Sequence, residues 1–217
     1  MILCEGLSKR FGYNFALRDV SFRSEGKIAI FGFNGAGKST LAKILAGVLK
    51  PSSGRVEIFG MEPRKSPGLR GEIGLVTHNP MLYRELTVKE NLEFYAKLYR
   101  AKDWKSVVED LKLSEKLGSR VLELSKGFIQ RVAIARALLA KPRVLILDEA
   151  LSGLDVESKE EVLRIIQNFN GTLVFSTHNF EDAKFCDNFL VLDRGKLSYF
   201  GENYEEALRV LSNSRSY

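Results

Sequence analysis

The sequence contains few of the residues that build disulfide-rich or zinc-binding proteins. Among its 217 residues there are two cysteines, Cys4 and Cys186, and two histidines. The cysteines lie far apart and form no C-x-x-C pair, so the pattern suggests neither a zinc site nor a disulfide framework. We expect both to be reduced thiols with a structural role.

Long hydrophobic runs are also missing. No segment approaches the ~18 uninterrupted apolar residues of a membrane-spanning helix. The opening MILCEGLSKR carries Glu5, Lys9 and Arg10 where a signal peptide has an apolar run. We therefore expect a cytoplasmic protein. With no internal repeat, low-complexity tract or Pro/Gly-rich linker, a chain of this length predicts a single domain, residues 1–217.

The charge balance is basic without being concentrated. Thirty-three Lys and Arg residues against 27 Asp and Glu give a net charge of +6. Such a balance is compatible with nucleotides, nucleic acid or an anionic membrane surface as partners. Because the basic residues are scattered along the chain, it excludes none of them.

What is present is an alternation of strand and helix patterns. Residues 27–31, 144–148 and 172–176 are short, nearly continuous apolar runs, which is typical of strands buried on both faces of a parallel sheet. Apolar residues then recur with helical spacing, which predicts a helix with one apolar face ending near Pro51. These apolar residues are Leu41, Ile44, Leu45, Val48 and Leu49.

The two ends and the middle of the chain differ from this pattern. Short strands around residues 2–7, 20–22 and 55–59, separated by Gly-containing turns, predict an antiparallel flanking sheet. A hairpin is expected to turn at residues 193–195. The stretch from about 86 to 140 shows long helical patterns and few strand signals, so we expect a helical insertion there.

The strongest motif is GFNGAGKST, which matches G-x-x-x-x-G-K-[ST] and lies between a predicted strand and a predicted helix. Gly35 and Gly37 let the backbone curl around the β-phosphate. Lys38 is expected at the β- and γ-phosphates, the Ser39 hydroxyl on Mg²⁺ and Thr40 at the α-phosphate. The alternative is a chance glycine turn, which the flanking strand and helix disfavour. The predicted nucleotide-binding residues are Gly32, Phe33, Asn34, Gly35, Ala36, Gly37, Lys38, Ser39 and Thr40.

A phosphate loop that hydrolyses ATP also needs carboxylates. Asp148 and Glu149 end the apolar run LILDE, and adjacent strand residues point in opposite directions. Asp148 is expected to hold Mg²⁺ through water, and Glu149 to act as general base for the attacking water. The alternative, a strand that simply ends in polar residues, loses weight because the phosphate loop is present.

His178 follows the apolar strand in FSTHN, at the sheet edge where α/β proteins bind ligands. A lone histidine is more often structural than catalytic. We nevertheless assign it a catalytic role, because this strand end is expected to lie beside the γ-phosphate.

With these motifs the chain resembles the ATP-binding domains of ABC transporters from end to end. The distinguishing segment is LSKGF at residues 124–128, which is similar to the LSGGQ signature of that family and lies before Asp148 at the expected distance. The resemblance implies a phosphate-loop NTPase core with a mostly parallel sheet, an N-terminal antiparallel flank and an inserted helical subdomain. The core would comprise about residues 1–77 and 141–217, and the helical subdomain about 78–140.

The resemblance also implies how further residues bind nucleotide. SGLD at residues 152–155 is similar to the D-loop, which brings Asp155 to the site, and Phe11 resembles the aromatic residue that stacks on adenine. The family forms a head-to-tail dimer, so Ser125 and Gly127 of one subunit would close over the γ-phosphate held by Lys38 of the other. The second subunit could be identical or different.

The sequence departs from the family pattern at three places. His78 replaces the glutamine usually found after the strand EIGLVT, and we expect it to be a different Mg²⁺ partner. In the signature, Lys126 and Phe128 replace a glycine and a glutamine. Ala150 stands where a proline often follows the catalytic glutamate. None of these removes a group that the chemistry needs.

The predicted function is therefore an Mg²⁺-dependent ATPase that drives a separately encoded integral-membrane permease from the inner face of the cell membrane. His78 and the LTVKENLEFYAKLY segment give a weaker similarity to haem-exporter ATPases of cytochrome c maturation. The alternative class is a soluble ABC ATPase acting on ribosomes, nucleic acid or cluster assembly. We expect no nucleic-acid partner, because the tandem, zinc and coiled-coil features of those branches are absent. A nucleotide-binding regulator without turnover is disfavoured because Glu149 and His178 are both present.

Overall fold

The computed structural model describes residues 1–214, which fold around two β-sheets. The larger sheet has the strand order β5-β6-β7-β3-β8-β9. All neighbouring pairs are parallel except β8 and β9, which confirms the predicted mostly parallel sheet. Its strands are β3 (Lys27–Phe31), β5 (Ile73–Val76), β6 (Val144–Asp148), β7 (Thr172–Ser176), β8 (Asn188–Asp193) and β9 (Lys196–Gly201).

The central strands are buried on both faces, as their apolar sequences predict. In β3, Ile28 and Ile30 face one hydrophobic core, whereas Ala29 and Phe31 face a second core on the opposite side. The first core lies between the larger sheet, α1 and the smaller sheet. The second lies under α3, α5, α6 and α7. Parallel strands need this double cover, because every connection between them crosses a face of the sheet.

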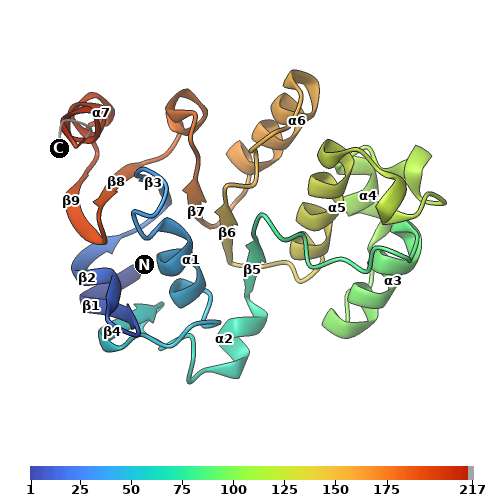
Figure 1. Ribbon diagram of the computed structural model, residues 1–217. Coiled ribbons are helices and arrows are strands. Elements are labelled where there is room, and N and C mark those ends of the chain that lie inside the picture. Colours follow the sequence, from blue (N-terminus) through green and yellow to red (C-terminus); the bar gives the residue numbers. More distant parts are fainter. Residues whose placement is uncertain (215–217) are drawn as a thin grey trace.

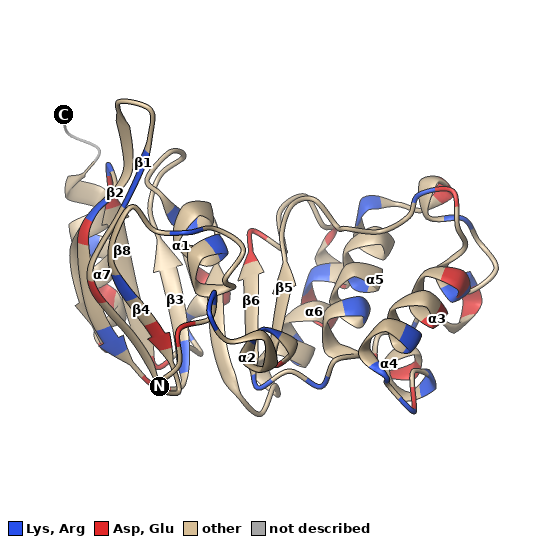
Figure 2. Cartoon of the chain, turned by 90° about the horizontal axis from the view of Figure 1, so that it is seen from below, with Lys and Arg blue, Asp and Glu red and all other residues tan. Residues whose placement is uncertain are grey.

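The smaller sheet has the antiparallel order β2-β1-β4, with β1 (Ile2–Phe11), β2 (Asn14–Ser24) and β4 (Ser53–Ile58). It lies beside α1 (Figures 1 and 2). The strands are longer than the predicted stretches 2–7 and 20–22. The reason is that β1 contains shifts of register, one of them at Gly6, which has φ of 57°. These shifts interrupt the apolar alternation that marks a strand in the sequence.

Helix α1 (Lys38–Leu45) is shorter than its apolar pattern predicts. The prediction that it continues to about Pro51 with Val48 on its apolar face is wrong. Gly47 adopts φ of 70°, and the backbone N–H groups of Val48 and Leu49 bond back to the carbonyl of Lys43. Val48 therefore lies beyond the helix and is 60% exposed. The glycine that ends the helix outweighs the apolar periodicity.

The stretch from 86 to 140 is helical, as predicted, and forms the green and yellow-green part of Figure 1. It contains α3 (Val88–Tyr99), α4 (Lys105–Asp110) and α5 (Lys126–Leu138), with 3₁₀ turns at Ser114–Lys116 and Val121–Glu123. Helix α3 begins at a capping box in which Thr87 and Glu90 bond to each other's backbone N–H groups. The proposed boundaries near 78 and 140 stay a prediction.

The remaining elements complete the cover of the larger sheet. They are α2 (Pro67–Gly71), α6 (Val156–Gln167), the 3₁₀ turn Phe180–Ala183 and α7 (Tyr204–Asn213). The predicted hairpin is confirmed, because β8 and β9 pair on either side of Arg194 and Gly195. Cys4 and Cys186 are buried free thiols. Within residues 1–214, no helix has the length and apolar character needed to cross a membrane. Lys, Arg, Asp and Glu are spread over both halves of the molecule (Figure 2).

Candidate functional site

The loop between β3 and α1 has a backbone that only its glycines allow. Gly35 and Gly37 have φ of 82° and 105°. A Cβ at Gly37 would also lie 2.5 Å from the carbonyl oxygen of Ala16 in β2, so glycine is required there for close packing as well as for conformation. The loop delivers the chain directly into the first turn of α1, where free backbone N–H groups favour an anion.

Hydrogen bonds from the β8–β9 turn hold this loop in place. The backbone N–H of Gly195 donates to the carbonyl of Ala36 at 3.1 Å, and the N–H of Arg18 donates to the carbonyl of Gly195 at 2.7 Å. Within the loop, the N–H of Ala36 donates to the carbonyl of Phe33 at 3.0 Å. The curvature expected for residues 32–37 is therefore built into the fold.

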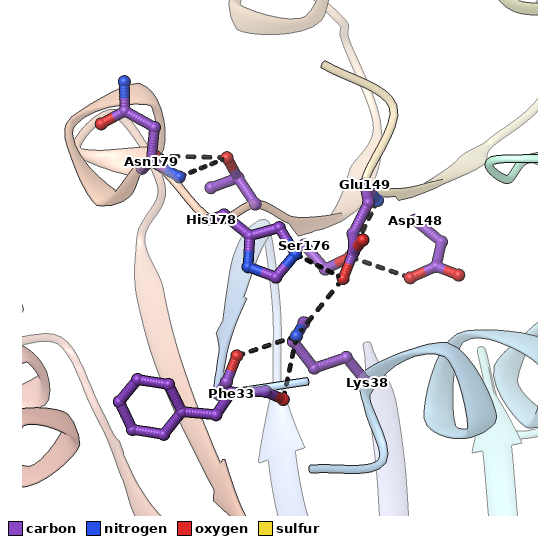
Figure 3. Close-up of polar contacts among 9 residues, drawn as sticks. Phe33, Lys38, Asp148, Glu149, Ser176, His178 and Asn179 are labelled. Carbon is purple, nitrogen blue, oxygen red and sulfur yellow. Dashed lines mark hydrogen bonds and ion pairs between the residues drawn. The ribbon is translucent and has the colours of Figure 1, made fainter. Parts of the chain in front are cut away.

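Lys38, the first residue of α1, points its side chain back across the loop (Figure 3). Its Nζ donates to the carbonyl oxygens of Gly32 at 2.8 Å and Phe33 at 3.3 Å. The same Nζ lies 3.3 Å from Oε1 of Glu149, and the residue is only 4% exposed. The ammonium is thus held at the mouth of the loop by all three of its donors.

Glu149 is positioned by a turn of the backbone just after β6. Its φ is 55°, and its N–H donates to the hydroxyl of Ser176 at 3.0 Å and to the carbonyl of the same residue at 3.1 Å. Its Oε1 also lies 3.0 Å from Nε2 of His178. Glu149 and Asp148 do face different partners, but a left-handed turn separates them rather than the strand alternation that we assumed.

Asp148 ends β6 in a buried position with 1% exposure. Its Oδ1 accepts a hydrogen bond from the Ser176 hydroxyl at 3.0 Å, whereas Oδ2 is buried and has no hydrogen-bond partner. A buried carboxylate oxygen without a donor is costly, and a hydrated Mg²⁺ would satisfy it. No cluster of three or more His, Cys, Asp or Glu side chains within residues 1–214 could hold a metal. One carboxylate oxygen without a donor fits Mg²⁺, which proteins usually bind through one or two carboxylates together with substrate phosphates.

The structure brings Lys38, Asp148, Glu149 and His178 together at the carboxyl ends of β3, β6 and β7 (Figure 3). His178 is attached by a turn in which the Thr177 hydroxyl accepts from the backbone N–H of Asn179. The side chain of His178 remains 45% exposed, so its ring can reach both Glu149 and solvent.

Ser125, Gly127 and Asp155 form a second group away from Lys38. Ser125 and Asp155 cap the N-termini of α5 and α6, and Gly127 is buried between them. A Cβ at Gly127 would lie 2.7 Å from the hydroxyl of Ser158, so the helices approach closely only because this residue is glycine. Hydrogen bonds from the backbone and side chain of Ser158 lower the pKa of Asp155. Ser125 and Asp155 line an open cavity of about 740 Å³ that Lys38 does not reach.

Two predicted site residues, His78 and Phe11, lie outside the cluster formed by Lys38, Asp148, Glu149 and His178. His78 is exposed two residues beyond β5, at the same sheet edge as Asp148, since Val76 pairs with Leu147. Phe11 ends β1 with 52% of its surface exposed, and Nζ of Lys9 lies 4.9 Å from the centre of its ring. The structure records no contact from either side chain to Glu149 or Asp148.

Ser176 is the residue that the sequence analysis missed. Its hydroxyl joins both carboxylate residues, since it donates to Asp148 and accepts from the backbone of Glu149. A signal was available: a hydroxyl residue ends an apolar strand, directly before Thr177 and His178, at the edge where Asp148 was already placed. Polar residues at the carboxyl ends of parallel strands should be considered together as candidates for the functional site.

Comparison with known proteins agrees with this geometry. The family model described as ABC transporter matches residues 17–152. The energy-coupling factor transporter ATP-binding protein EcfA1 of Mycoplasma mobile is 38% identical over 94% of this chain and 78% of its own length. The chain belongs to the ABC transporter family. It is an ATPase of that family, in which the bound nucleotide is ATP.

Other relatives are consistent with this membership. The Nod factor export ATP-binding protein I of Rhizobium johnstonii is 35% identical over 88% of this chain, and the chain spans 66% of that relative's length. The dimeric post-hydrolysis structure of the ATP-binding cassette MJ0796 bound to ADP and Pi has a TM-score of 0.81. It is 27% identical, and the match covers 93% of this chain and 98% of that one. The haem-exporter subgroup stays a prediction.

Proposed function

We propose that the cluster of Lys38, Glu149 and His178 is the hydrolytic centre of a transporter-driving ATPase. The observation that carries this proposal is that Oε1 of Glu149 lies 3.3 Å from Nζ of Lys38 and 3.0 Å from Nε2 of His178. A phosphate-binding cation, a carboxylate base and an imidazole donor thus converge on one point. A cation can bind the transferring phosphate, a carboxylate can accept a proton from the attacking water, and an imidazole N–H can donate to the charge that develops.

ATP binding rearranges this cluster in the proposed cycle. The γ-phosphate replaces the Glu149 carboxylate as the counter-charge of Lys38, while the loop N–H groups bind the β-phosphate. Glu149 is then free to accept a proton from the water that attacks the γ-phosphorus. The bond from that phosphorus to the bridging oxygen breaks, and ADP leaves with that oxygen. His178 keeps the carboxylate oriented and donates to the γ-phosphate.

Asp148, Ser39 and His78 are the proposed residues for Mg²⁺. Asp148 offers the unpartnered Oδ2, and Ser39 lies next to Lys38 in the first turn of α1. When bound, Mg²⁺ neutralises charge on the β- and γ-phosphates. His78 is the least constrained of the three because its side chain is exposed.

Two copies of the chain are proposed to form a head-to-tail dimer. Each copy carries a complete phosphate loop and a complete set of Ser125, Gly127 and Asp155, but the two sets lie in separate places on one chain. When two copies pack head to tail, each phosphate loop meets the Ser125 group of the other copy. Two identical chains then complete two sites. Phe11 is proposed to stack on the adenine in each.

Mixing two inactive variants tests this arrangement. Lys38→Ala removes the phosphate cation, and Ser125→Arg blocks the opposite face. Each variant alone forms two damaged sites and should be inactive. The mixed dimer has one site with both defects and one with neither, so ATP hydrolysis and nucleotide trapping should return at about half of the sites. No intact site in either measurement would contradict the shared arrangement.

The membrane partner is proposed to dock on an aromatic patch formed by Met81, Tyr83, Phe94, Tyr95 and Leu98. All but Tyr95 are 40% to 61% exposed. The rings of Tyr83 and Phe94 lie 5.1 Å apart, and the Tyr95 hydroxyl donates to the Met81 carbonyl at 2.5 Å. Partial burial raises the pKa of Tyr95. The patch is ordered by its own contacts yet still exposes apolar surface, which is typical of an interaction site.

Photocrosslinking from position 83 tests this docking. A photoreactive residue at Tyr83, in the cells that carry this gene, should cross-link to an integral-membrane protein, as a permease partner requires. The control places the same residue at Val48, which is 60% exposed but lies just beyond α1, outside the aromatic patch. Equal cross-linking from both positions would contradict specific docking. Peripheral attachment to the inner face of the membrane follows from the proposed contact.

A further inference from the structure

An ion pair joins helix α6 to the turn that follows His178. Nζ of Lys159, near the start of α6, lies 2.7 Å from Oδ1 of Asp182 in the 3₁₀ turn Phe180–Ala183. The side chain of Asp182 is only 8% exposed, and that of Lys159 is 25% exposed. A carboxylate buried to this extent is costly unless it is paired and hydrogen-bonded. The contact between these two elements is therefore a defined one, unlike an ion pair on the open surface.

The same carboxylate oxygen also orders the backbone around His178. Oδ1 of Asp182 accepts a second hydrogen bond, from Nδ2 of Asn179 at 3.1 Å, and the N–H of Asp182 donates to the carbonyl of Asn179 at 3.1 Å. The N–H of Asn179 in turn donates to the Thr177 hydroxyl at 3.1 Å, across His178. The neighbours of His178 are thus bonded to one another, and Asp182 ties them to Lys159.

A cavity of about 280 Å³ lies beside this contact. The residues that line it include Glu149, Lys159, His178, Asp182 and the turn at residues 151–154. Two ion pairs join its lining residues. One is the contact between Nε2 of His178 and Oε1 of Glu149 at 3.0 Å (Figure 3), and the other is the contact between Lys159 and Asp182. Close packing cannot fix the spacing of side chains across an open cavity, which leaves that role to the polar contacts of its lining residues.

These contacts make the position of His178 depend on α6. We propose that Asp182 and Lys159 form a positioning pair that fixes the imidazole ring of His178 for ATP hydrolysis. The pair acts through the turn and not on the nucleotide. Because the N–H of Lys159 donates to the carbonyl of Asp155 at 3.0 Å, a displacement of the start of α6 moves Lys159 with it. This inference rests on the proposed function, in which His178 takes part in hydrolysis.

Removing the charge of Asp182 should slow hydrolysis without weakening ATP binding. Asp182→Asn keeps an acceptor for Asn179 but gives Lys159 no counter-charge. We expect kcat to fall at least about tenfold, because a small misplacement of a group at the reacting centre lowers turnover strongly. KM and ATP affinity should stay at the wild-type values.

Variants of Lys159 show whether the two side chains act as a pair. Lys159→Met should lower kcat as Asp182→Asn does, and Lys159→Arg should recover most of the loss. The double variant of Lys159→Met and Asp182→Asn leaves no unpaired charge and should lose no more activity than either single variant. Independent, additive losses would overturn the pair.

The ring signals of His178 report its position directly. The chain has two histidines, so a His78→Gln background without a histidine tag leaves one imidazole in the proton NMR spectrum. Asp182→Asn should shift these ring C–H signals, while the unfolding temperature shows that the variant is folded. The proposal is overturned if the signals do not move, or if lower turnover only follows a loss of ATP affinity.

Glu181→Gln is the matched control. Glu181 lies next to Asp182 in the same turn and forms an ion pair with Lys184 at 2.6 Å, but the two side chains are 66% and 50% exposed. This ion pair does not reach α6, so the variant should leave kcat and the His178 signals unchanged. Equal effects of Glu181→Gln and Asp182→Asn would overturn the proposal, because any charge in the turn would then serve.

His178→Ala separates this inference from the proposed function. If His178→Ala keeps wild-type turnover, the hydrolytic role of His178 is wrong, and the positioning pair falls with it. If His178→Ala loses turnover, Asp182→Asn added to it should cause no further loss. A further loss, or wild-type turnover of Asp182→Asn alone, would overturn the positioning pair and leave the hydrolytic centre in place.

Discussion

Oε1 of Glu149 is shared between Nζ of Lys38, at 3.3 Å, and Nε2 of His178, at 3.0 Å. Lys38 is almost fully buried, whereas the side chains of Glu149 and His178 are 27% and 45% exposed. The carboxylate therefore joins a buried cation to a partly exposed imidazole ring. A ligand that replaces the Glu149 carboxylate at Lys38 would therefore also disturb the contact between Glu149 and His178.

The first prediction concerns Glu149→Gln, which keeps the shape of the side chain but cannot accept a proton. Turnover should fall by about 10²- to 10⁴-fold, while ATP affinity is kept or increased because the competing charge at Lys38 is gone. A dimer should appear by size exclusion with ATP and be absent with ADP. Turnover at the wild-type rate would remove Glu149 from the role of base.

A second prediction follows from Ser176. Ser176→Ala leaves Oδ1 of Asp148 and the N–H of Glu149 without their hydroxyl partner. We expect the free energy of unfolding to fall by about 1–3 kcal/mol and half-maximal ATPase activity to need more Mg²⁺. Urea unfolding and a Mg²⁺ titration measure the two effects. Ser53→Ala, at the exposed first residue of β4, is the control and should change neither.

The third prediction tests whether His78 replaces the missing glutamine at the Mg²⁺ site or is only an exposed residue at a strand end. If His78 does the work of the missing glutamine, His78→Gln should keep ATPase activity and Mg²⁺ dependence, whereas His78→Ala should need more Mg²⁺. The measurement is a Mg²⁺ titration of both variants. Should both match the wild type, His78 is an exposed residue at a strand end, and the haem-exporter similarity loses its main support.

Buried thiols give a prediction about pH. Burial raises the pKa of Cys4 and of Cys186 to about 12, compared with an ordinary value of about 8.5 for an exposed thiol. The native thiols stay neutral through this interval while those of the unfolded chain ionise. Their contribution to stability is therefore complete below about pH 8.5 and is lost as the pH rises toward 12.

Alkylation of the thiols tests this directly. At pH 8, iodoacetamide should leave both cysteines of the native protein unmodified, because the thiolate is the reactive form. In denaturant both should react quickly. Mass spectrometry of peptides that contain Cys4 and Cys186 gives the extent of reaction. Fast modification of native Cys186 would show that it is not held in the core.

A fifth prediction concerns Gly127→Ala. The added methyl group would meet the Ser158 hydroxyl at 2.7 Å, and that hydroxyl also donates to Asp155 at 2.9 Å. We expect α5 and α6 to separate slightly, with a loss of stability of about 1–3 kcal/mol, measured by urea unfolding. Gly118→Ala is the control, since a Cβ at Gly118 meets no atom within 4 Å.

The sequence predicted the bounds of an element best where all residues of that element lie in the same environment. The bounds of β3, β6 and β7 agree with their apolar runs, because both faces of these strands are buried and their sequences therefore carry no polar alternation. The glycine loop was placed correctly between β3 and α1, because its motif requires a strand before it and a helix after it. Its nucleotide contacts stay a prediction. The end of α1 failed, since apolar periodicity continued to Val48 after Gly47 had already ended the helix.

Side-chain contacts between segments that lie far apart in the chain could not be predicted from the sequence. The polar end of β7 indicates that Ser176 lies at the sheet edge, but the sequence does not show that its hydroxyl reaches Asp148, 28 residues away in the chain. The ion pair between Lys38 and Glu149 likewise depends on how the strands are ordered. Strand order is a property of the packed core and has no local pattern.

The hydrogen bond from Gly195 to Ala36 joins the phosphate loop to a segment that the ribosome makes much later. Strand β3 is flanked by β7 and β8, so the segment that begins the phosphate loop gains its first neighbour in the sheet at residues 172–176 and its second at residues 188–193. At roughly 5–20 residues per second, the ribosome needs roughly 8–30 s to go from β3 to β8. Throughout that interval the loop sequence is present but unsupported. We therefore expect ATP to bind late in folding, because a chain that stops before Gly195 carries the complete motif without the turn that holds Ala36.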